Sequence, residues 1–126
     1  MMYLEPTGRC FSYATEWAGK HGGVVVHADV LFPRSVVARV ENLRGKRLAH
    51  AWVEFDGLVR DHQGQGKKPV SVSDFYAEFD PTNVQRYPKM EALELAIFTR
   101  NWGPWTEAEK EAHRESKIKA TKGRRR

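Results

Sequence analysis

The chain of 126 residues contains a single cysteine, Cys10. One thiol excludes an intramolecular disulfide framework and a zinc site built from several thiolates. No stretch of about 18 apolar residues is present, which excludes a membrane-spanning helix. The first residues, MMYLEPTGRC, lack the apolar segment of a signal peptide. We therefore expect a water-soluble protein in a reducing, cytoplasmic setting.

The length and the 40% hydrophobic content are typical of one folded domain. Eight of the 21 basic residues lie in residues 110–126, where only Glu111 and Glu115 oppose them. We expect a near-neutral domain over residues 1–109, followed by a basic helix end and tail over residues 110–126. The tail has two interpretations, a solvated helix end that maintains solubility or a weak, sequence-independent contact with nucleic-acid phosphates.

Local patterns predict an α+β fold in which an N-terminal helix bearing Cys10 packs on a four-stranded antiparallel sheet, with further helices following. Helical spacing predicts a helix over residues 10–20 that ends at Gly22 and Gly23, since glycine suits the left-handed cap. Period-two alternation predicts strands over residues 24–32 and 35–40. The pair Asp56–Gly57, with alternating residues on both sides, predicts a type I′ hairpin over residues 48–63.

The second half of the chain is predicted to be mainly helical. Residues 72–76 fit either a helical turn or a short strand, and residues 80–83 are expected to be irregular. Apolar spacing predicts a helix over residues 90–98. Thr106 and Glu109 have the spacing of a capping box that opens a last helix. We expect Trp17, Phe55 and Phe98 to lie in the core.

The hairpin brings candidate functional residues together. A two-residue loop makes His50 and Asp61 diagonal neighbours, with Cβ atoms about 7 Å apart. We expect the opposite hairpin face, which carries Ala51 and Val53, to cover the core. An aspartate in this position holds the imidazole in one tautomer and stabilises its protonated form.

Cys10 is the thiol that such a histidine would serve. The helix dipole and a nearby imidazolium both lower the pKa of a thiol and favour the nucleophilic thiolate. A cysteine on the first helix, a histidine on a later strand and an acid on the next strand form a coherent triad order. Taken separately, each residue has a structural interpretation: a buried apolar thiol, a structural histidine, and an aspartate paired with a surface arginine.

The segment His50-Ala51-Trp52-Val53-Glu54, followed by Gly57 and Asp61, resembles the histidine segment of the transglutaminase-like superfamily. Gly8-Arg9-Cys10 and the following small residues resemble the cysteine segment of the same superfamily. The resemblance covers roughly residues 7–63 and implies a papain-like α+β core.

Carried over to this sequence, the resemblance makes Cys10 the nucleophile, His50 the general base and acid, and Asp61 the orienting acid. The Cys10 backbone N–H would contribute to an oxyanion hole. Asp80 is the alternative third member, since Phe79-Asp80-Pro81-Thr82 resembles the string that carries the aspartate in transglutaminases. We expect thiol-dependent hydrolysis or acyl transfer on amide bonds of a peptide or protein, with no cofactor or metal. Trp52 is expected either to line the substrate groove or to pack over the cysteine helix.

Two other function classes are open at this point. One is a non-catalytic binding protein of the same fold, which would use the Trp102–Trp105 segment and the basic tail to contact a protein or nucleic acid. The other is a metal hydrolase built from His27, Asp29, His50 or His62. No histidine pair has the H-x-x-x-H spacing of a helical zinc site, which argues against the metal interpretation.

Overall fold

A computed structural model describes residues 9–31, 45–62 and 68–124. In chain order the elements are α1 (Arg9–His21), β1 (Val24–Leu31), β2 (Arg47–Phe55), β3 (Leu58–Arg60), β4 (Val70–Ser71), α2 (Val72–Phe79), β5 (Thr82–Pro88), α3 (Lys89–Thr99) and α4 (Glu107–Arg124). The α+β class is therefore confirmed, with the Cys10-bearing helix ahead of the sheet and two helices after it.

The strands form one antiparallel sheet in the order β4-β3-β2-β1-β5. The sheet has five strands rather than the four expected. The expected strand over residues 35–40 lies outside the described residues. β5 was missed because Pro81 precedes it, the turn residue Asn83 is its second residue, and its end is Pro88. An edge strand tolerates such residues, because one side of its backbone pairs with no neighbour.

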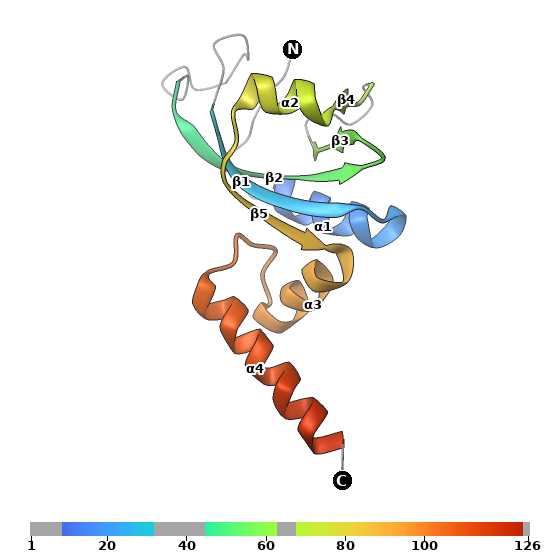
Figure 1. Cartoon of the computed structure of the whole chain (residues 1–126), viewed down its shortest axis with the longest axis vertical. Helices are drawn as coiled ribbons and strands as arrows, with labels where there is room; N and C mark the ends of the chain where they lie inside the picture. The colour runs from blue at the N-terminus through green and yellow to red at the C-terminus, as the bar shows by residue number, and fades with distance from the viewer. Residues whose placement is uncertain (1–8, 32–44, 63–67, 125–126) are drawn as a thin grey trace.

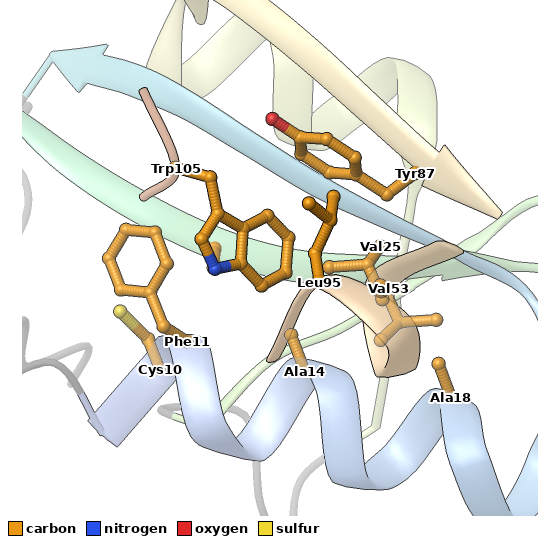
Figure 2. Close-up of a cluster of buried hydrophobic side chains, with 11 residues drawn as sticks. Cys10, Phe11, Ala14, Ala18, Val25, Val53, Tyr87, Leu95 and Trp105 are labelled. Carbon is orange, nitrogen blue, oxygen red and sulfur yellow. The ribbon is translucent and has the colours of Figure 1, made fainter. Parts of the chain in front are cut away.

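Both faces of the sheet are covered, as Figure 1 shows, with α2 on one side and α1 and α3 on the other. On the α2 side, Val26, Trp52, Phe75 and Phe79 share one buried cluster. The other face holds a second cluster drawn in Figure 2: Cys10, Phe11, Ala14, Ala18, Val25, Ala51, Val53, Tyr87, Ala92, Leu95 and Trp105. The hairpin face with Ala51 and Val53 covers this core as expected, and the opposite hairpin face lies against α2.

The turns that set the positions of α1 and the hairpin were predicted correctly. α1 ends at Gly22 and Gly23, both with φ of +97°. Asp56 and Gly57 have φ of 54° and 75°, as a type I′ turn requires. The hairpin pairs Val53 with Arg60 and Phe55 with Leu58, which is the register that a two-residue loop predicts.

Two expectations about apolar side chains were wrong. Phe55 is 39% exposed and Phe98 is 43% exposed, so neither is a core residue, and Trp17 is only partly buried. α3 buries Ala92 and Leu95 instead, because its small residues allow close approach to α1.

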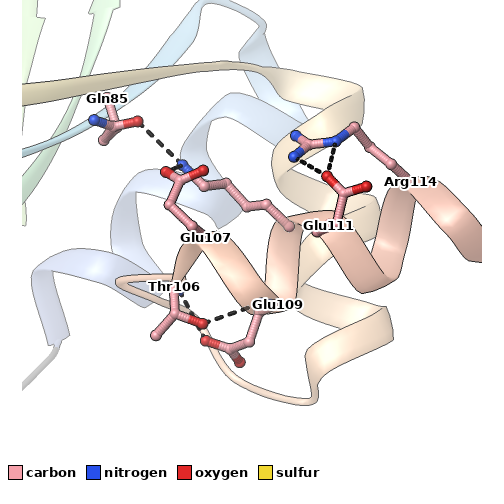
Figure 3. Close-up of polar contacts among 7 residues, drawn as sticks. Gln85, Thr106, Glu107, Glu109, Glu111 and Arg114 are labelled. Atoms are coloured by element: carbon pink, nitrogen blue, oxygen red, sulfur yellow. Dashed lines mark hydrogen bonds and ion pairs between the residues drawn. The ribbon is translucent and has the colours of Figure 1, made fainter.

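α4 begins with the expected capping box. The Glu109 backbone N–H donates to Thr106 Oγ1, and the Thr106 N–H donates to Glu109 Oε1, both drawn in Figure 3. Lys110 and His113 are buried against the body, with Lys110 Nζ donating to Gln85 Oε1 at 3.1 Å. The expected division after residue 109 therefore falls inside α4, whose later turns extend away from the body (Figure 1).

Candidate active site

Cys10 lies in the first turn of α1, where backbone N–H groups have no partner within the helix. Its side chain is buried, with 3% exposure, on the sheet face that carries Ala51. The backbone N–H groups of Phe11 and Ala51 both donate toward the sulfur. Two donors at one sulfur favour its negatively charged form.

His50 and Asp61 meet where β3 ends. β3 stops at Arg60, opposite Val53, so Asp61 is the first residue beyond the ladder. His50 Nε2 lies 3.3 Å from Asp61 Oδ2, and the two residues are 4% and 7% exposed. The diagonal neighbourship expected from the hairpin register is therefore present in the structure.

The His50 imidazole links the thiol to the carboxylate. Its Nε2 lies against Asp61 Oδ2, and the ring also makes a hydrogen bond with the Cys10 side chain. Both neighbours favour the protonated ring. Burial lowers the pKa of His50, but the hydrogen bonds and charges of Asp61 and Cys10 outweigh it and raise the pKa to about 9.

The thiol responds in the opposite direction. Burial raises the pKa of Cys10, but the hydrogen bond and charge of His50, together with the N–H groups of Ala51 and Phe11, lower it below its ordinary value. A lowered thiol pKa beside a raised imidazole pKa favours the thiolate–imidazolium pair over the neutral thiol and neutral imidazole. This pair is the form in which a cysteine attacks a carbonyl carbon.

The structure distinguishes the two candidate aspartates. Asp80 lies at the C-terminal cap of α2 with φ of 43°, and its side chain is 66% exposed. Its carboxylate pairs with Arg47 at 2.6 Å. Asp61 contacts His50, whereas Asp80 closes a surface ion pair between β2 and the end of α2.

Trp52 occupies the core rather than a groove surface. Its side chain has no solvent exposure and packs on Phe75, with ring centroids 4.8 Å apart. It therefore lies over α2, not over the cysteine helix. Its ring also lies 5.9 Å from that of His50, so Trp52 supports the imidazole from within the core.

Glu54, the last residue of the resemblance segment, holds a polar network that the sequence did not reveal. Trp52 Nε1 and the Tyr76 hydroxyl donate to Glu54 Oε2 at 3.0 and 2.7 Å. Arg86 Nη1 donates to Glu54 Oε1 at 2.7 Å. Trp52 is a neighbour on β2, but Tyr76 and Arg86 come from α2 and β5, so no local pattern predicts their contacts. The network fixes the Trp52 ring, and the Trp52 ring packs on His50.

Tyr13 is a further residue near the site that the sequence analysis missed. Burial, and then the charge of Asp61, raise the pKa of its hydroxyl. Its ring packs on His62 with centroids 5.8 Å apart. The sequence could have indicated Tyr13, because a residue three positions after Cys10 in a helix lies on the same helix face.

The other residues considered for a metal site are separated. His62 packs on Tyr13, while His27 is buried on β1 among aromatic rings. Within residues 9–31, 45–62 and 68–124, no group of three or more histidine, cysteine or acidic side chains is placed to hold a metal ion.

Comparisons of the chain with models of known protein families, with curated proteins and with solved structures found no match. Among the helices of the described residues, none is both long and apolar enough to cross a bilayer.

Proposed function

We propose that the protein is a thiol-dependent hydrolase or acyltransferase that acts on amide bonds of a peptide or protein. One observation carries the proposal: the buried His50 ring is hydrogen-bonded to both the Cys10 side chain and the Asp61 carboxylate. A structural histidine needs one satisfied nitrogen, whereas this arrangement is the one that generates a nucleophilic thiolate.

The reaction follows from the positions of these atoms. The Cys10 thiolate adds to the amide carbonyl carbon, and the tetrahedral intermediate collapses when the protonated His50 gives its proton to the leaving nitrogen. A thioester to Cys10 remains. Water or an amine then attacks it, His50 takes the proton of the attacking group, and the thiolate leaves. The Cys10 backbone N–H stabilises the oxyanion in this proposal.

The resemblance to the transglutaminase-like superfamily supports the same chemistry. The segment from His50 to Glu54 contributes the base, while Glu54 itself closes the network behind it. A reducing compartment such as the cytoplasm belongs to this proposal, because oxidation would remove the single thiol.

The first test is loss of turnover in two substitutions. Cys10→Ala and His50→Ala should each abolish release of amines from a peptide library, or incorporation of a fluorescent primary amine into it. The melting curves should stay cooperative. His21→Ala is the matched control, because His21 is exposed at the far end of α1. Undiminished turnover in either active-site variant would overturn the mechanism.

The alternative is a non-catalytic binding protein, and two observations favour it. All three triad side chains are less than 10% exposed, and the later turns of α4, in a segment rich in basic residues, extend from the body (Figure 1). Trp102, 42% exposed, adds an aromatic contact surface. In this case Cys10 would show no excess reactivity at neutral pH, and the protein would bind polyanions without any turnover.

A further inference from the structure

A pocket of about 160 Å³ lies on the α1 face of the sheet. Among its lining residues are Phe11, His27, Asp29, Ala49, Tyr87 and Trp105. Phe11 follows Cys10 in α1, and Ala49 precedes His50 in β2. Cys10, Phe11 and Trp105 also belong to one cluster, and Figure 2 shows the sulfur next to the Phe11 ring. The pocket therefore lies on the same sheet face as the Cys10 thiol and is lined by the residue that follows it in α1.

His27 leaves hydrogen-bonding capacity unused in this pocket. It is 4% exposed, and neither of its ring nitrogens has a hydrogen-bond partner in the part of the chain that the structure describes. Aromatic rings surround it, with centroid distances of 4.7 Å to Phe11, 4.9 Å to Trp105 and 5.0 Å to Tyr87. Burial, followed by the charge of Lys110, lowers the pKa of His27 to about 3, so the ring is neutral and one nitrogen is an acceptor. A buried acceptor without a partner costs free energy until a ligand or water supplies a donor.

Asp29 adds a negative charge to the same pocket. It lies two residues after His27 on β1, on the same face of the strand. Among the described residues, its carboxylate has no ion pair. The nearby cation Lys110 is already held by Glu107 at 2.7 Å and by Gln85. A carboxylate and a neutral acceptor between aromatic walls suit a cation, which gains from ion pairing and from the faces of the rings.

We propose that this pocket binds the side chain of the substrate residue whose carbonyl Cys10 attacks, and that it selects a primary ammonium group such as that of lysine. The inference rests on the proposed function and names its substrate class. If each non-hydrogen atom takes the volume of one water molecule in the liquid, about 30 Å³, the pocket holds about five such atoms, which is the number in a lysine side chain. The ammonium group would pair with Asp29 and donate to His27.

The first experiment compares peptide amides that differ only at this residue, with lysine, norleucine or glutamate. Norleucine keeps the four-carbon chain and removes the charge. We expect kcat/KM for lysine to exceed that for norleucine about tenfold or more, as one good ion pair would produce. Asp29→Asn should reduce that ratio several-fold. Asp56→Asn removes the same charge from the remote hairpin turn and should leave the ratio unchanged. Equal rates for lysine and norleucine would overturn the inference while leaving the proposed function intact.

The second experiment needs no turnover, so it separates a failure of the proposed function from a failure of the proposed cation selectivity. The rate of Cys10 modification is measured with 2-aminoethyl and 2-sulfonatoethyl methanethiosulfonate, which carry opposite charges on similar chains. The cationic reagent should react faster, by about threefold or more for a charge within about 10 Å. Asp29→Asn should reduce the preference, and Asp56→Asn should not. If no peptide is turned over, the proposed function fails, and the presence or absence of this preference still decides whether the pocket selects cations.

Discussion

At the scale of single residues, Cys10 depends on neighbours from three parts of the chain. The helix supplies the Phe11 N–H, β2 supplies the Ala51 N–H and the His50 ring, and Asp61 beyond β3 fixes that ring. Burial alone would make the thiol a poor nucleophile, since it raises the thiol pKa. The charged partner reverses this effect, so the reactivity of Cys10 depends on His50.

Alkylation tests this dependence directly. Wild-type protein should react with iodoacetamide at pH 6.5 faster than an ordinary thiol does, because the lowered pKa of Cys10 increases its thiolate fraction. His50→Ala should slow the reaction at pH 6.5 by about tenfold or more, since an ordinary thiol with a pKa of about 8.5 is mostly protonated there. A pH dependence that is the same in both proteins would contradict the thiolate–imidazolium pair.

The raised pKa of His50 predicts the alkaline limit of turnover. The ring must be protonated to serve the leaving nitrogen, so kcat/KM should fall as the pH rises through about 9. Asp61→Asn keeps an acceptor near Nε2 but removes its charge. This change should move the limit to lower pH and reduce kcat by about a hundredfold, within the usual range for acid–base catalysis.

Asp80→Asn provides the matched control for the Asp61 substitution. It breaks only the exposed pair with Arg47. Surface pairs of this kind contribute about 1 kcal/mol or less, so turnover and its pH limit should stay unchanged. A larger loss in Asp80→Asn than in Asp61→Asn would assign the third triad position to Asp80.

At the scale of elements, the connection between α1 and β1 sets where the thiol meets the sheet. Gly23 has φ of +97°, and a Cβ at this position would lie 2.8 Å from Val53 Cγ1 and 2.9 Å from the Glu54 carbonyl oxygen. The close approach holds the end of α1 against β2, the strand that carries His50. Glycine is required here by both the backbone angle and the space.

Gly23→Ala should therefore destabilise the protein more than a glycine-to-alanine change at a position that has a positive φ but free space around the added Cβ. Gly45→Ala is the control, because Gly45 has φ of +78° and nothing within 4 Å of its added Cβ. We expect a loss of about 1 kcal/mol in the control from the positive φ. Gly23→Ala should lose about 1–3 kcal/mol more from overpacking. Denaturant unfolding of both variants measures the difference, and equal losses would show that the contact with Val53 is unimportant.

At the scale of the whole molecule, the charge is divided between a near-neutral body and the outer half of α4. Beyond the buried Lys110 and His113, and beyond Lys117, which pairs with Glu94 of α3, the last turns of α4 leave the body. Such an arrangement is suited to weak, salt-dependent contact with polyanions. This contact would be independent of the triad.

Anisotropy with a labelled duplex DNA tests the outer half of α4. We expect dissociation constants of about 10⁻⁴–10⁻⁶ M that weaken steeply with salt. Lys119→Gln combined with Lys122→Gln should weaken binding, whereas Lys20→Gln combined with Lys89→Gln should have a smaller effect. Equal losses from both pairs would mean that total charge, rather than α4, determines the contact.

Local chemistry in the sequence determined most of the first half of the fold. Residues close in the chain decide the end of α1 at its glycines, the Asp56–Gly57 turn and the register that brings His50 to Asp61. The capping box of α4 is local for the same reason. Each depends on backbone angles or spacings within one hairpin or helix turn, and these are visible in a single sequence.

Only the tertiary structure decided the features that join distant segments. β5 pairs with β1 although its residues have no clear strand pattern, and α2 buries a sheet face that would otherwise be exposed. Packing likewise moved Trp52 into the core and brought His27 and Asp29 beside the α1 N-terminus. These outcomes depend on which surfaces meet after the chain has folded, and contacts between residues far apart in sequence leave no periodic signal.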